Sequence, residues 1–237
     1  MQGPQISSYF EGKPTIEAFN EIGVDSVAVG NHKFDWGQDA LNQRIAEANF
    51  SFLANNIIDD STGTQPRCIA PYKVFKIDGL NVGVIGVGNP DTNVTLPEAT
   101  QGLSFLELQG TAAAVTVSVE ELRAQKVETV VLTPHMGLET ASAGPLAELL
   151  RALPEETADE LDFVLGGHIP LDISAKINGV PVVQPFGNTR GYADADRQPC
   201  DRQRGQVLCH LRPGDDRRCP TRSRSESDSG PLPGAAR

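Results

Sequence analysis

Short runs of aliphatic and β-branched residues alternate with amphipathic helical segments through the first 196 residues, and this alternation limits the possible folds more than any other feature. Strand-like runs cover residues 24–29, 50–54, 129–133 and 162–165. Apolar residues recur with helical spacing in residues 14–22, 39–48, 109–125, 146–153 and 155–161. Strands that alternate with helices are typical of a parallel sheet covered by helices, so we expect an α/β fold.

Two dipeptides indicate β-hairpins in the same region. Asp78-Gly79 lies between the apolar runs 72–77 and 80–87, and Asn178-Gly179 lies between 175–177 and 180–183. Both dipeptides readily adopt the left-handed backbone conformation that a two-residue hairpin turn requires. We therefore expect two antiparallel strand pairs beside the parallel ones.

The composition changes near residue 196. Residues 197–237 are rich in Arg, Pro and Ser, and they show almost no apolar periodicity. One interpretation is a basic tail that binds RNA or an acidic partner, and the other is a terminus without regular structure. Because Pro, Cys and acidic residues interrupt the basic runs, we favour the second. The predicted organisation is a folded domain, residues 1–196, followed by a disordered tail, residues 197–237.

The predicted domain is strongly acidic, with 26 Asp and Glu against 11 Lys and Arg in residues 1–196. This charge disfavours nucleic acid as a partner, because an acidic surface repels the phosphate backbone. No apolar run approaches the roughly 20 residues of a membrane helix, and the first residues lack the pattern of a signal peptide. The four cysteines include no Cys-x-x-Cys pair, which argues against a zinc ribbon. The sequence gives no indication of the oligomeric state.

Three of the four histidines stand just past a strand-like run: SVAVGNH ends at His32, TVVLTPH at His135 and FVLGGH at His168. Ligands of open α/β sheets bind where the carboxyl ends of strands meet loops. Each histidine alone could simply bond a neighbouring carbonyl group, but three such endings favour one shared site. Neutral imidazole is a common ligand of divalent metals, and the Asn31 amide oxygen can add to it.

Asp35 follows His32 by three residues, and two interpretations are open. The carboxylate could orient the His32 ring and stabilise its charged form, so that the histidine assists a leaving oxygen as an acid. Alternatively, Asp35 could cap the helix that follows.

Three motifs in this sequence resemble those of a known family. GVDSVAVGNHKFDWG resembles the GNHEFD signature of the 5′-nucleotidase branch of the calcineurin-like metallophosphoesterases. VVLTPHMG is similar to that family's strand-then-His-x-Gly motif, and VLGGHIP resembles its Gly-Gly-His-x-His motif. The motifs stand in the family's order, and the resemblance spans roughly residues 6–194.

The resemblance implies a four-layer α/β/β/α sandwich with a dinuclear centre of Zn, Mn, Co or Fe ions. By position, it implies Asn31, His135 and His168 as metal ligands, His32 as the catalytic histidine that contacts phosphate, and Asp35 as its partner. It also implies hydrolysis of small phosphate esters or anhydrides, such as nucleoside 5′-monophosphates, sugar nucleotides and 2′,3′-cyclic nucleotides. A location in the cell envelope or outside the cell would follow from the same resemblance.

The sequence departs from the family pattern in ways that bear on catalysis. Nothing before Asn31 matches the family's Asp-x-His and Gly-Asp motifs, so we expect a catalytic domain incomplete at its N-terminus, with impaired activity. Pro170 replaces the second histidine of Gly-Gly-His-x-His, and Lys33 stands where the family usually has Glu. The family's C-terminal nucleotide-binding domain is not recognisable. The alternative hypothesis is therefore an inactive fragment, or a domain that binds a single metal without turnover.

Overall fold

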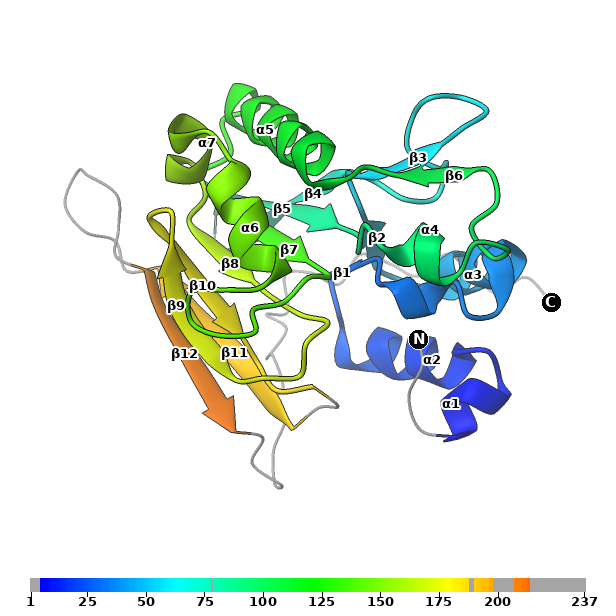
Figure 1. Ribbon diagram of the computed structural model, residues 1–237. Coiled ribbons are helices and arrows are strands. Elements are labelled where there is room, and N and C mark those ends of the chain that lie inside the picture. Colours follow the sequence, from blue (N-terminus) through cyan, green and yellow to red (C-terminus); the bar gives the residue numbers. More distant parts are fainter. Residues whose placement is uncertain (1–4, 78, 188–189, 198–206, 214–237) are drawn as a thin grey trace.

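A six-stranded mixed sheet forms the centre of the computed structural model, which describes residues 5–77, 79–187, 190–197 and 207–213 (Figure 1). In spatial order its strands are β4 (Tyr72–Ile77), β5 (Leu80–Val87), β7 (Thr129–Pro134), β8 (Phe163–Leu165), β10 (Val180–Gln184) and β9 (Ile173–Ile177). The four inner strands run parallel, and β4 and β9 pair antiparallel at the two edges. The parallel core agrees with the alternation of strands and helices along the sequence.

Both predicted hairpins are confirmed. Strands β4 and β5 pair in the register Ile77 to Leu80, although Asp78 of the intervening turn lies outside the described residues. Strands β9 and β10 pair in the register Ile177 to Val180, and Asn178 and Gly179 have φ angles of 48° and 80°. Two successive left-handed residues form the tight turn that an Asn-Gly dipeptide favours.

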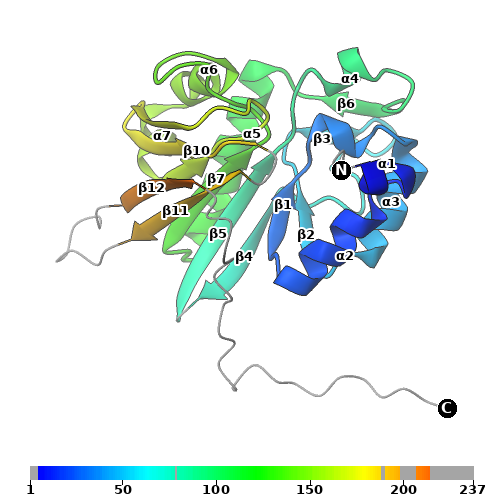
Figure 2. The same cartoon turned by 90° about the horizontal axis from the view of Figure 1, so that it is seen from below.

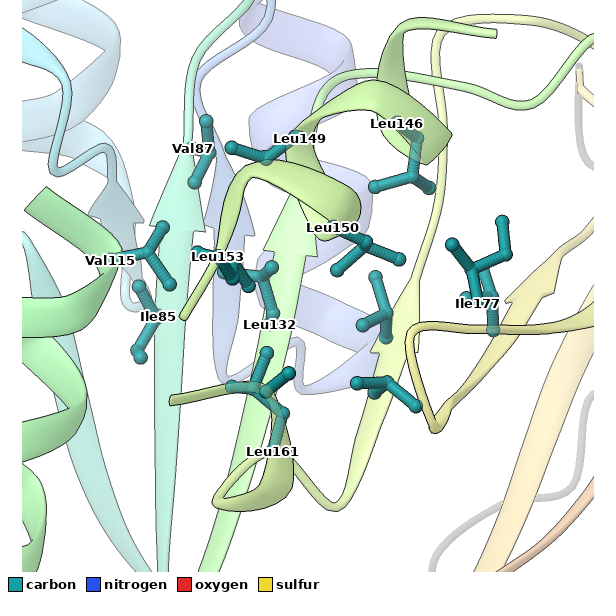
Figure 3. Packing of buried hydrophobic residues seen from close by; sticks show 14 of the residues in the cluster. Ile85, Val87, Val115, Leu132, Leu146, Leu149, Leu150, Leu153, Leu161 and Ile177 are labelled. Carbon is teal, nitrogen blue, oxygen red and sulfur yellow. The ribbon is translucent and has the colours of Figure 1, made fainter. Parts of the chain in front are cut away.

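One face of this sheet is covered by α5 (Leu108–Ala124), α6 (Pro145–Ala152) and α7 (Glu155–Asp159) (Figure 1). The buried positions of α5 recur every three or four residues, which gives the helix one apolar stripe. Side chains of α6 pack with Ile85, Val87 and Leu132 of the strands in one hydrophobic core (Figure 3). Pro154 separates α6 from α7, as the sequence predicts.

On the opposite face, a second, small parallel sheet of β1 (Ser26–Ala28) and β2 (Ser51–Leu53) packs over β4, β5 and β7. The helices α2 (Lys13–Ile22) and α3 (Gly37–Glu47) lie on the outer side of that sheet (Figure 2). A second core, which includes Ile16, Leu41 and Phe52, fills the space beneath these helices. The two sheets approach closely, because a Cβ atom added at Gly86 would lie 2.3 Å from Leu53. The order of layers is therefore helix, sheet, sheet, helix, which agrees with the expected fold class.

The remaining elements are short. They are α1 (Gln5–Tyr9), the 3-10 turn η1 (Asn31–Lys33), α4 (Thr92–Thr95), the antiparallel pair β3 (Ile57–Asp59) and β6 (Leu103–Phe105), and the antiparallel pair β11 (Gly191–Arg197) and β12 (Val207–Pro213). Sequence periodicity predicts none of them. All except β11 and β12 have three to five residues, which is too few for a clear periodic pattern. None of the described helices combines the length and the apolar character needed to cross a bilayer.

Strand β12 lies inside the region that composition predicts to lack regular structure. Residues 207–213 pair with β11 along its whole length, so that prediction is wrong for this segment. The segment VLCHLRP holds the most apolar run of the tail. Pairing with β11 also provides partners for its backbone N–H and C=O groups, and composition alone does not predict such pairing. The rest of the predicted tail, residues 198–206 and 214–237, lies outside the described residues.

Candidate metal centre

Three loops from two sheets meet at the candidate site. Asn31 and His32 lie on η1, which follows β1, whereas His135 and His168 follow the neighbouring parallel strands β7 and β8. Phe34 anchors the η1 turn, since its ring is 1% exposed and packs edge-on against Phe105 at 5.7 Å between ring centroids. The carboxyl ends of three strands thus present polar side chains to one place.

Polar atoms of the other two predicted metal ligands, Asn31 and His168, converge on the His135 ring. His135 Nε2 lies 3.1 Å from Asn31 Oδ1 and 3.3 Å from His168 Nδ1. Nε2 of a neutral ring carries either one proton or one lone pair, so it cannot form good hydrogen bonds to both atoms at once, and one of the two approaches is left unsatisfied. Tetrahedral ligands at zinc distances of about 2.1 Å lie about 3.4 Å apart. The observed separations are close to that value, so these residues fit a divalent metal.

Gly30 allows the His135 ring to lie against the backbone of the η1 loop. A Cβ atom added at Gly30 would lie 2.6 Å from Cε1 of His135 and 2.7 Å from both ring nitrogens. Gly30 itself has an ordinary extended backbone, with φ −91° and ψ 164°. Glycine is therefore required here for space and not for conformation.

His168 adopts an unusual backbone conformation. Its φ angle is 66°, and the Ile169 amide donates to the Gly167 carbonyl at 2.7 Å, which closes a γ-turn with His168 at its centre. A histidine held with positive φ is uncommon, and such strain concentrates at functional sites. The turn places the ring nitrogen of His168 against the ring of His135.

The electrostatic environment keeps both rings neutral near pH 7. Burial, followed by the charges of His168 and Lys33, lowers the pKa of His135 to about 3. Burial and the His32 charge also lower the pKa of His168, while Asp91 acts in the opposite direction. A neutral imidazole offers a lone pair to a metal, whereas a protonated ring repels one.

His32 and Asp35 form a separate pair on the same turn as Asn31. His32 Nδ1 lies 3.1 Å from both carboxylate oxygens of Asp35. The His32 side chain is 50% exposed and that of Asp35 is 14% exposed. Trp36, not Asp35, occupies the N-cap position of α3, and no side-chain hydrogen bond caps this helix. Asp35 therefore does not take the capping role considered as the alternative.

Lys33 places a cation close to this centre. Burial lowers the pKa of the Lys33 ammonium, while Asp35 opposes that shift. The same ammonium is close enough to influence the pKa of His135. Pro170, two residues beyond His168, has no side-chain atom that could bind a metal.

The five predicted site residues therefore lie in one region. In the part of the chain that the structure describes, no three His, Cys, Asp or Glu residues form a cluster that could hold a metal. The trio contains only two histidines, and its third donor is the amide oxygen of Asn31. Sequence reasoning missed Asp91, which follows the apolar strand β5 and influences the pKa of His168. Its position just past a strand-like run was a usable signal. The expectation that ligands bind at the carboxyl ends of strands, which drew attention to the three histidines, applies equally to Asp91.

The sequence and fold are similar to those of known phosphoesterases. No protein-family model matches the chain. It is 32% identical over 172 residues to a 5′-nucleotidase of Vibrio cholerae, a match that covers 70% of this chain and 30% of that protein. The fold is similar to the crystal structure of a 5′-nucleotidase precursor from Thermus thermophilus, with a TM-score of 0.73, 21% identity, and coverage of 90% and 43% of the two chains.

A second solved structure with a similar fold is the calcineurin-like phosphoesterase YfkN of Bacillus subtilis. Its TM-score is 0.69 at 19% identity, and the match covers 89% of this chain and 70% of that one. At such low identities these two structures support the fold alone. The chain matches only a minor part of the curated relatives' own length, with 30% of the Vibrio cholerae protein covered.

Proposed function

Since the chain belongs to the 5′-nucleotidase branch of the calcineurin-like metallophosphoesterases, we propose that it carries a metal-dependent centre for hydrolysis of small phosphate esters. Membership of that family implies divalent metal ions. The substrate class that we propose is a nucleotide or a related phosphate ester. The observation that supports this proposal best is the convergence on His135 Nε2 of Asn31 Oδ1, at 3.1 Å, and His168 Nδ1, at 3.3 Å.

Each residue has a distinct role in this proposal. Asn31, His135 and His168 would hold a divalent metal through one amide oxygen and two neutral ring nitrogens. A bound metal of this kind supplies charge stabilisation for phosphoryl oxygens and makes hydroxide available at neutral pH. His32, held by the Asp35 carboxylate through Nδ1, would contact the phosphate or the leaving oxygen. The half-exposed position of His32 leaves it accessible to a substrate from solvent.

The second candidate function is metal binding without turnover. It is favoured by the donor set, because the described residues offer one compact trio and no cluster of three His, Cys, Asp or Glu for another ion. A dinuclear centre stabilises both the attacking and the leaving oxygen, so a single ion would supply less of the catalysis. Zn, Mn, Co and Fe are the candidate metals, with one ion for each chain.

Metal content and turnover distinguish the two candidates. The protein is stripped with a chelator, reloaded with Mn²⁺ or Co²⁺, and analysed for bound ions per chain by elemental mass spectrometry. AMP, UDP-glucose and a chromogenic phosphodiester are then tested as substrates beside the His32→Ala variant. Hydrolysis that is lost in the variant supports the enzymatic proposal, and stoichiometric metal without hydrolysis supports the second candidate. Absence of metal binding would refute both.

A further inference from the structure

Gln184, the last residue of β10, is a fully buried polar residue that the proposed chemistry does not use. Its side-chain amide makes three hydrogen bonds in the interior. Oε1 accepts from the Leu138 amide at 2.6 Å, and Nε2 donates to the carbonyl oxygens of Leu138 and Leu171, both at 3.1 Å. A buried amide is costly unless its donors and acceptor are bonded, so this arrangement requires both loops to stay in place.

The partners of Gln184 occupy equivalent positions in the two ligand loops. Leu138 lies three residues after His135, and Leu171 lies three residues after His168. The Gln184 amide therefore connects the loop that follows β7 to the loop that follows β8. A single buried side chain thus bonds the backbone of both loops that carry the histidines.

The same two loops are in direct backbone contact beside Gln184. The Gly167 amide donates to the Met136 carbonyl at 3.0 Å. A Cβ atom added at Gly137 would lie 2.6 Å from the Gly167 carbonyl oxygen. Such close packing leaves little room for one loop to shift without moving the other.

We infer that Gln184 is a positioning residue that holds the ring nitrogens of His135 and His168 at the separation a shared metal needs. This inference rests on the metal-binding function proposed above. An amide suits the role because it donates two hydrogen bonds and accepts others from one planar group. Methionine at this position would fill a similar volume with neither strong donors nor a strong acceptor. A protonated glutamate would retain one donor and one acceptor.

The test compares Gln184→Met and Gln184→Glu with Val182→Ala. Val182 is a matched control because it is fully buried on the same strand and packs into the hydrophobic core beneath the helices. The probe is Co²⁺ added to the metal-free protein, followed by its visible absorption spectrum and by a chelator competition. We expect Gln184→Met to bind Co²⁺ about 10- to 100-fold more weakly, as is usual when a residue that orients ligands is lost. Gln184→Glu should lie between Gln184→Met and the wild type, and Val182→Ala should bind like the wild type.

Amide hydrogen exchange of the metal-free proteins gives a second measurement that does not depend on activity. The Leu138 amide should exchange faster in Gln184→Met and at the wild-type rate in Val182→Ala. Co²⁺ affinity within twofold of the wild type in both Gln184 variants would overturn the inference while the proposed function stands. Equal weakening in Val182→Ala would also overturn it, because a general loss of stability would then explain the effect. If Gln184→Met does not fold, Gln184→Glu alone decides. A wild-type protein that binds no Co²⁺ overturns the proposed function together with the inference.

Discussion

Replacing Gly30 with alanine should displace the His135 ring from the candidate metal centre. The added Cβ atom would lie 2.6 Å from His135 Cε1, whereas ordinary contacts begin at 3.4 Å, so the ring must retreat by the difference of about 0.8 Å. Functional constellations tolerate displacements of about 0.5 Å. Because the backbone of Gly30 is open to alanine, the steric clash is the expected effect of the substitution.

Titration with Co²⁺ measures the effect of this displacement on metal affinity, and the Gly167→Ala variant is the control. A Cβ atom added at Gly167 meets nothing closer than the Pro134 carbonyl at 3.7 Å, although this glycine adjoins His168. We expect Gly30→Ala to lose at least about tenfold in Co²⁺ affinity, as for other displaced metal ligands, and Gly167→Ala to bind normally. Wild-type affinity in Gly30→Ala would refute the steric reasoning, and so would equal losses in both variants.

Asp35→Asn should lower kcat about 10- to 100-fold at unchanged metal content, because a neutral amide stabilises the charged His32 ring less than a carboxylate does; unchanged kcat would contradict the assigned role. In the metal-free protein the pKa of His135 is about 3, below its ordinary value of 6.5, so protonation favours the unfolded chain and stability is lost as the pH falls below 6.5. Urea denaturation should show that the free energy of unfolding falls by about 2 kcal/mol between pH 6.5 and 5. The His135→Gln variant should lack this decrease, and the same pH dependence in the variant would exclude His135 as its source. Arg44→Ala should lower the free energy of unfolding by roughly 2–4 kcal/mol, because Arg44 is 4% exposed and donates a hydrogen bond to Glu47 at 3.0 Å. A urea midpoint equal to that of the wild type would contradict this prediction.

Much of the fold follows from local features of the sequence. Helix α5 begins and ends within one residue of its prediction, because a long apolar stripe is a strong periodic signal. The turn at Asn178-Gly179 was predictable because few dipeptides accept two successive left-handed residues. The expectation that residues at the carboxyl ends of strands lie close together holds for His135 and His168, because His135 Nε2 and His168 Nδ1 are 3.3 Å apart.

Several features of the site could not be read from the sequence. Gln184 bonds Leu138 across 46 residues of sequence, and a glutamine at the end of an apolar strand carries no local signal of that contact. The need for glycine at Gly30 appears only when the His135 ring is seen against its backbone. Strand β12 forms against β11, and composition does not describe such pairing.

Local sequence was sufficient to predict the main strands and helices, the hairpin turns and the residues placed at strand ends, because these depend on neighbours a few positions away. Folding of the whole chain was needed to bring Asn31, His135 and His168 within hydrogen-bonding distance in one trio. Packing of two sheets and burial of ring nitrogens depend on contacts between distant segments. Those contacts set both the distances and the pKa values of the site, and no local pattern encodes them.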